Sequence, residues 1–296
     1  MKVICFVFLV FIFGGCKPGV VENRKPRVVS TTTMLKDLVL QIGGDDFQTT
    51  SIMSPGGDPH LYQPTPKDVK SIAMSDLVIV NGLNLEGWID DLVRNAASNK
   101  TVIVASKGVT PIGMADTHGM DPHFWFDLNL WRIAARNVAK ALTPLLGEDG
   151  QTRIRHNLKR YLEEIENIEK ECQRLLNTIP KNQRVLVTSH DAFAYFGRAF
   201  GMEVVPIQGV STEQEASNRD VINVIEMIKK RKLKSVFIET SVNPALVKQV
   251  AKETGAHLSG PLYSDSIGIA SSEANTFLKA ILVNVKIITK GLRGET

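Results

Sequence analysis

The chain is poor in cysteine and aromatic residues and has little excess charge, and each shortage excludes a class of protein. Three cysteines in 296 residues are too few for a disulfide framework. Aromatic residues make up 6% of the chain, the net charge is +4, and the dense basic run at residues 229–232 is typical of a solvated helix end. We therefore expect no nucleic-acid partner. No H-E-x-x-H segment or phosphate-binding loop is present, which argues against the enzymes built on those motifs.

The N-terminus has the pattern of a targeting segment. The apolar stretch Val3–Phe13 is shorter than the roughly 20 residues that span a bilayer, but it suits a secretory signal. Small residues directly before Cys16 resemble a bacterial lipoprotein box, so Cys16 would be lipidated; an ordinary cleaved signal with an incidental cysteine is the alternative. We predict a signal peptide at residues 1–15 and a polar tether at residues 16–26.

Short apolar or β-branched runs alternate with helical patterns in both halves of the chain. The strands expected from these runs lie near residues 27–33, 50–53, 77–80, 102–104, 184–189, 204–207, 235–238 and 261–263. This alternation predicts an α/β fold with mainly parallel sheets. The similar order of the two halves suggests two βα lobes related by duplication, at residues 27–147 and 181–296.

Between the lobes lies a long amphipathic pattern. Its apolar stripe recurs every three or four residues, at Ile154, Leu158, Leu162, Ile165, Ile168, Cys172, Leu175 and Ile179. We predict a helix from Gln151 to Ile179, about 40 Å long and ended by Pro180. It would serve as a rigid spine at residues 148–180, with Cys172 packed beneath it.

Four short segments each hold one strong metal ligand on a turn: Asp58-Pro59-His60, Asp121-Pro122-His123, Ser189-His190-Asp191 and Ser264-Asp265-Ser266. A proline before a histidine stiffens the backbone that aims the imidazole. Three imidazoles and one carboxylate, without thiolate, suit one divalent transition-metal ion such as zinc, manganese or iron. Ligands of open α/β sheets bind at the carboxyl ends of strands, so we expect the ion in the cleft between the lobes.

Each of these residues has a simpler interpretation when it is taken alone. A histidine in a turn is often a surface hydrogen-bonding group, and Asp265 could be a turn residue or a helix N-cap. We expect structural roles for His156 and His257, while His118 is an auxiliary candidate ligand. Glu239, at the end of a predicted strand, could be the general base of a hydrolase, but it more simply orients a histidine.

The chain resembles the TroA-like metal-binding lipoproteins, the solute-binding components of zinc, manganese and iron ABC importers. The resemblance is carried by residues 57–65, 121–127, 189–196 and 263–266. It implies that His60, His123, His190 and Asp265 bind one divalent ion per chain and that the protein is no enzyme. It also implies a monomer, lipid-anchored outside the cytoplasmic membrane in the periplasm or at the cell surface, that delivers the ion to a permease driven by an ATPase.

Two features bear on the choice of metal. Members of this family with Glu at the third ligand position resemble manganese binders, and this chain has His190 there. Zinc-specialised members carry a long His-rich loop before the second ligand, whereas residues 115–120 hold one histidine. We therefore expect broader use of zinc, manganese or iron. A surface adhesin with a structural metal and a metallohydrolase remain the alternatives.

Overall fold

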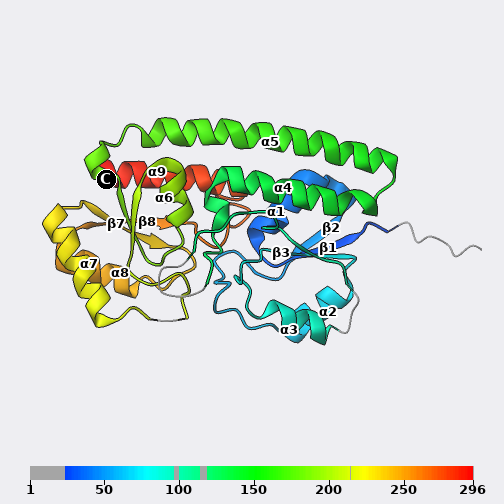
Figure 1. Ribbon diagram of the computed structural model, residues 1–296, viewed down its shortest axis with the longest axis horizontal. Coiled ribbons are helices and arrows are strands. Elements are labelled where there is room, and N and C mark those ends of the chain that lie inside the picture. Colours follow the sequence, from blue (N-terminus) through cyan, green and yellow to red (C-terminus); the bar gives the residue numbers. More distant parts are fainter. Residues whose placement is uncertain (1–23, 97–99, 114–118, 214, 296) are drawn as a thin grey trace, which may run out of the picture.

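The computed structural model describes residues 24–96, 100–113, 119–213 and 215–295 (Figure 1). The predicted signal peptide, Cys16, most of the predicted tether and His118 lie outside the described residues. Within the described ranges, no helix is both long enough and apolar enough to cross a membrane.

The first lobe contains a four-stranded parallel sheet. Its strands are β1 (Arg27–Ser30), β2 (Gln48–Ser51), β3 (Leu77–Val80) and β4 (Val102–Val104), in the order β2-β1-β3-β4. All four residues of β3 are buried, as expected for an inner parallel strand that is covered on both faces. The predicted parallel α/β architecture is confirmed here.

The second lobe divides its strands between two small parallel sheets. They pair β5 (Val185–Thr188) with β6 (Glu203–Pro206), and β7 (Ser235–Glu239) with β8 (His257–Leu262). Because β5 packs beside β7, the spatial order β6-β5-β7-β8 repeats that of the first lobe. His257, for which we expected a structural role, is the first residue of β8.

Helices cover both faces of the strands (Figure 1). The layer on the α5 side consists of α1 (Thr33–Gly43), α4 (Leu128–Leu142), α5 (Glu148–Leu176), α6 (Ala194–Phe200) and α9 (Phe277–Arg293). On the opposite side lie α2 (Pro66–Ala73), α3 (Ile89–Asn95), α7 (Asn218–Arg231) and α8 (Ala245–Thr254). Short 3-10 helices are present at Gly44–Asp46, Phe124–Phe126, Thr143–Leu145 and Lys181–Gln183.

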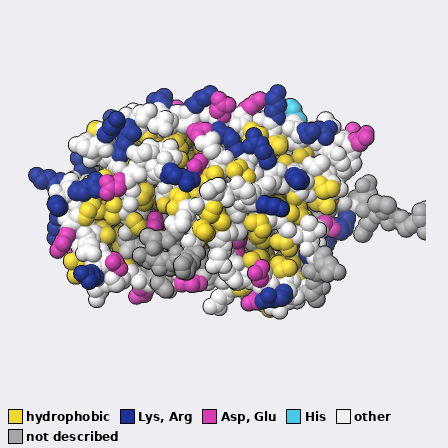
Figure 2. All heavy atoms as spheres, in the orientation of Figure 1, with side chains coloured by type: hydrophobic (Ala, Val, Ile, Leu, Met, Phe, Trp, Pro, Cys, Tyr) yellow, Lys and Arg dark blue, Asp and Glu magenta, His cyan; other side chains and the backbone are white. Residues whose placement is uncertain are grey.

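Helix α5 runs along both lobes (Figure 1). The predicted end at Ile179 was wrong, because the helix ends at Leu176 and the next residues form a turn in which the Ile179 amide donates to the Leu176 carbonyl (3.1 Å). A proline disfavours the helical conformation of the residue before it, so Pro180 ends the helix earlier than its apolar stripe suggests. The solvent side carries charges of both signs, which are mixed over the face shown in Figure 2.

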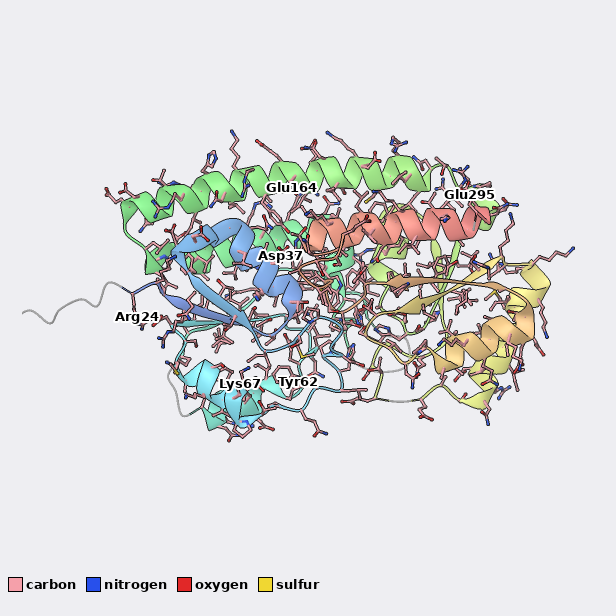
Figure 3. The ribbon with its side chains drawn as sticks, turned by 180° about the vertical axis from the view of Figure 1, so that it is seen from behind. Arg24, Asp37, Tyr62, Lys67, Glu164 and Glu295 are labelled. Atoms are coloured by element: carbon pink, nitrogen blue, oxygen red, sulfur yellow. The ribbon has the colours of Figure 1, made fainter. Side chains whose placement is uncertain are left out.

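A continuous apolar core lies beneath α5 and joins the two lobes. Trp131 of α4 stacks on Phe277 of α9, with ring centroids 4.2 Å apart, and donates its indole N–H to Tyr161 of α5 (3.0 Å). Buried Asp37 of α1 accepts the Phe277 amide (2.9 Å), near the approach of α1 to α9 seen in Figure 3. The lobes are therefore fixed by packed side chains as well as by the chain that connects them.

Candidate metal centre

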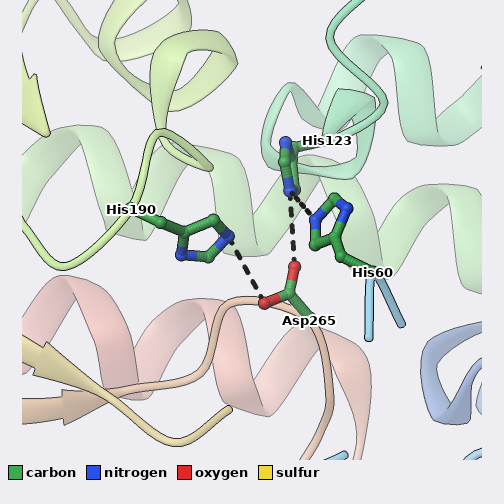
Figure 4. A group of neighbouring side chains, drawn as sticks. All are labelled: His60, His123, His190 and Asp265. Carbon is green, nitrogen blue, oxygen red and sulfur yellow. Dashed lines mark hydrogen bonds and ion pairs between the residues drawn. The ribbon is translucent and has the colours of Figure 1, made fainter. Parts of the chain in front are cut away.

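Three histidines and one aspartate meet between the lobes. His60, His123, His190 and Asp265 each offer one ligand atom, and these atoms lie within 4.8 Å of one another (Figure 4). Nε2 of His60 is 3.3 Å from Nε2 of His123, which is 3.4 Å from Oδ1 of Asp265. Nε2 of His190 is 3.5 Å from Oδ2 of Asp265. The structure thus brings together all four residues that we singled out as candidate ligands.

Each of the four residues lies on a loop. His190 follows β5 and Asp265 follows β8, whereas His60 lies between β2 and α2 and His123 directly precedes the short helix Phe124–Phe126. The ends of β5 and β8 therefore supply two of the side chains, as expected at the carboxyl ends of parallel strands. Two side chains come from each lobe, so an ion bound by all four would join the lobes.

The His123 imidazole is oriented by a neighbouring carboxylate. Oδ1 of Asp121 accepts the His123 backbone amide (2.9 Å) and lies 2.7 Å from Nδ1 of the same residue. Both side chains are buried. A carboxylate on the outer ring nitrogen fixes the tautomer and directs Nε2 toward the centre, which is the arrangement seen around metal-binding histidines.

The His190 imidazole has an equivalent partner from another strand. Its Nδ1 lies 2.6 Å from Oε2 of Glu239, the last residue of β7, and Oε1 of Glu239 accepts the His190 backbone amide (3.0 Å). Both side chains are fully buried. This geometry suits orientation of a histidine better than activation of a water molecule, since both oxygens of the carboxylate lie against His190.

Asp265 is held by two hydroxyl groups. Its Oδ2 accepts hydrogen bonds from Ser241 (2.7 Å) and Ser264 (2.9 Å). Ser264 was part of the sequence motif, but Ser241 was missed; its only signal was its place just beyond the strand that ends at Glu239. Trp125 also donates to the Ser264 carbonyl (3.0 Å), which links the His123 loop to the Asp265 loop.

His60 is the one candidate ligand that is only partly buried. Its backbone amide donates to Oδ1 of Asp58 (2.9 Å), and Trp88 donates to the Pro59 carbonyl (3.0 Å). Among the described residues, no carboxylate pairs with its Nδ1, unlike the other two imidazoles. A cavity of about 540 Å³ opens beside it, lined by residues that include Tyr62 and Met120, and none of the other three candidate ligands lines it.

Burial and opposite charges act against each other in the centre. Burial disfavours charged His123 and His190, but nearby carboxylates outweigh burial, raising the pKa of His123 to about 9 and that of His190 well above its usual value. Although burial would raise it, the pKa of Asp265 lies well below its usual range because His190 and His123 favour the carboxylate. Burial, followed by the charge of His123, lowers the pKa of His60 to about 3.

This donor set is suited to a divalent transition-metal ion. Nitrogen and carboxylate donors without a thiolate accept zinc, manganese and iron. Nε2 of His190 and Oδ1 of Asp265 are buried and make no well-formed hydrogen bond within the described part of the chain. Such groups are costly to bury unpaired, and an ion at the centre would give both a partner.

Comparison with known proteins points to the same class. The family model of the periplasmic zinc-uptake complex component A matches residues 28–291. The manganese-binding lipoprotein MntA of Bacillus subtilis (strain 168) is 32% identical over 300 residues, covering 97% of both chains. The zinc-binding protein TroA of Treponema pallidum (strain Nichols) is 34% identical over 287 residues, covering 94% of this chain and 92% of TroA.

Solved structures agree with this similarity. The periplasmic zinc-binding protein TroA from Treponema pallidum superposes with a TM-score of 0.87 at 32% identity, covering 91% of this chain and 99% of that chain. A manganese-bound periplasmic metal-binding protein from Candidatus Liberibacter asiaticus gives a TM-score of 0.81 at 28% identity, covering 90% and 100%. These relatives give no support to the adhesin or hydrolase alternatives.

Proposed function

The chain belongs to the family of the zinc-uptake complex component A, and from this premise we propose that it captures a divalent transition-metal ion and delivers it to an ABC importer. The observation that carries the proposal is the meeting of three imidazoles and one carboxylate, from four loops and two lobes, within 4.8 Å. The ion is cargo, so the site has to bind it and release it rather than use it for chemistry.

In this proposal His60, His123, His190 and Asp265 bind one ion per chain. Asp121 and Glu239 support the assignment, because each places a carboxylate on the outer nitrogen of a candidate ligand. Relatives are named for manganese in one case and zinc in another, and we propose that this chain accepts zinc, manganese or iron.

The proposed partners are a membrane permease and its ATPase. We propose a monomer that acts outside the cytoplasmic membrane, in the periplasm or at the cell surface, anchored through a lipid on Cys16. A signal peptide at residues 1–15 and a tether at residues 16–26 would precede the two lobes, which the spine at residues 148–180 joins. No catalytic residue is proposed, since four protein ligands leave little room for an activated water.

Ion capture would exchange protons for metal. Nearby carboxylates raise the pKa of both His123 and His190 in the metal-free centre, so Nε2 of each ring would have to give up a proton before it binds an ion. The packed core between α1, α5 and α9 favours small loop movements over wide hinge closure. Opening is therefore expected on the His60 side, where the cavity lies.

The test is a competitive titration of metal-free protein with zinc, manganese and iron(II), with bound metal counted by elemental analysis. The proposal expects one removable ion per chain and loss of high-affinity binding in Asp265→Ala. A matched control is Asp45→Ala, which removes an exposed carboxylate and should leave binding unchanged. Absence of binding by the unmodified protein, or equal binding by both variants, would refute the proposal.

A further inference from the structure

The two Asp-Pro-His turns share their local geometry but use their aspartates differently. In both, Oδ1 of the aspartate accepts the histidine backbone amide at 2.9 Å. In the second turn, the same Oδ1 of Asp121 also contacts Nδ1 of the His123 ring. Asp58 instead uses its Oδ2 to accept the hydroxyl of Thr212 (2.6 Å), a residue of the other lobe that lies 154 positions away in sequence.

Thr212 lies on a loop that is fixed to the His190 segment. The loop follows β6, and its Ile207 and Gln208 amides donate to the carbonyls of Thr188 and Ser189 (3.0 Å each). In the opposite direction, the amide of Asp191 donates to the Gly209 carbonyl (3.2 Å). The Thr212 hydroxyl therefore connects the turn that carries His60 to the backbone that carries His190.

The position of His60 depends on its backbone more than that of the other histidines does. Among the described residues, its imidazole has no carboxylate on the outer nitrogen, and it faces a cavity that Ser211 and Glu213 of the Thr212 loop also line. Asp58 holds its amide, and Thr212 is the side chain from the opposite lobe that holds Asp58. A second contact between the lobes joins the Gly56 amide to the Ser266 hydroxyl (2.8 Å).

We propose that Thr212 is a positioning residue for ion retention, which keeps His60 on the ion by holding Asp58 across the lobes. This inference rests on the proposed function. His60 is then the last ligand to close on an arriving ion and the first to leave, on the side of the cavity. Loss of the Thr212 hydroxyl should accelerate release while the other three ligands still accept the ion.

The substitution Thr212→Val removes the hydroxyl and keeps the shape of the side chain. A hydrogen bond to a charged group is lost, and an increase of about ten-fold in the zinc dissociation rate is expected. Thr212→Ser keeps the donor and should restore the rate of the unmodified protein. Thr178→Val is the matched control, because Thr178 is exposed just beyond the end of α5 and its hydroxyl donates to the nearby Leu175 carbonyl.

The experiment loads each full chain with zinc, mixes it with excess EDTA in a stopped-flow instrument and records the release rate. The melting temperature of the metal-free protein is measured in parallel, since a merely structural role would lower this temperature and leave the release rate unchanged. In an Asp58→Ala background, Thr212→Val should add no further acceleration, because both residues act through one contact.

Faster release in Thr212→Val, rescue in Thr212→Ser and an unchanged rate in Thr178→Val would support the inference. The inference would be overturned if a folded Thr212→Val protein released zinc at the unmodified rate. It would also be overturned if Thr212→Val accelerated release as much in the Asp58→Ala background as it does in the unmodified protein. Failure of the proposed function has a different result, because the unmodified protein would then bind no zinc or bind it independently of Asp265.

Discussion

Nδ1 of His190 lies 2.6 Å from Oε2 of Glu239, and both side chains are fully buried. We predict that Glu239→Gln weakens zinc binding by about ten-fold or more, because the amide cannot match the carboxylate in orienting the imidazole. Competitive titration against a fluorescent chelator measures this change. Glu253→Gln, on the exposed side of α8, is the control. Equal affinity in both variants would show that Glu239 does not tune the site.

Metal affinity should rise with pH. The pKa of His123 is raised to about 9 and that of His190 lies well above its usual value, so we expect both rings to be imidazolium cations at neutral pH in the metal-free protein. Each proton displaced by the ion makes affinity change by about ten-fold per pH unit. Calorimetry in buffers with different ionisation enthalpies counts the protons, and we expect about two per ion. Binding without proton release would contradict the charge state derived for the centre.

The metal-free protein should show the opposite trend in stability. The folded-state pKa of His123 is raised to about 9, above the value of about 6.5 for an unfolded chain. Its contribution to stability is therefore fully present below pH 6.5 and is lost as pH rises through about 9. Thermal unfolding followed across this range should show the loss in metal-free protein and a smaller loss in His123→Ala, because the pKa of His190 is also raised.

The contact of Tyr161 with Trp131 should matter for stability but not for ion binding. Tyr161→Phe removes the acceptor of the buried Trp131 indole N–H. An unsatisfied buried donor costs about 1–3 kcal/mol, so urea unfolding of the metal-free protein should show a loss of that size. Zinc affinity should stay the same. A large loss of affinity would mean that the spine controls the site directly.

Cys172 should be inert in the folded protein. It is fully buried, and burial raises the pKa of its thiol to about 12. The reactive thiolate is thus scarce at neutral pH, and reagents cannot reach it. In a chain that begins after Cys16, iodoacetamide should modify Cys172 only once urea has unfolded the protein. Rapid modification under native conditions would contradict the packing of α5.

Local patterns made much of the fold predictable from the sequence. The apolar run Leu77–Val80 and the apolar stripe of α5 were enough to predict which of their side chains are buried. The turns around His60 and His123 are equally local, because in each the aspartate accepts the amide of the histidine two residues later. The place of Glu239 at the end of a strand was also enough to suggest that it orients a histidine. These features depend on neighbouring residues, which a single sequence shows.

Contacts between distant segments could not be predicted from the sequence. The Asp58–Thr212 hydrogen bond joins residues 154 positions apart, and no local pattern distinguishes Asp58 from Asp121. Ser241 was missed for the same reason, because its hydroxyl meets Asp265 only after β7 and β8 have paired. The division of the second lobe into two small sheets likewise depends on how β5 packs against β7.

The central claim is that one ion binds between the lobes on four named side chains. Anomalous diffraction at the zinc absorption edge, from crystals of zinc-loaded protein, tests it most directly. The account predicts one strong peak per chain, about 2.0–2.2 Å from Nε2 of His60, His123 and His190 and from a carboxylate oxygen of Asp265. A peak elsewhere, for example at exposed His156, with none between the lobes would contradict it.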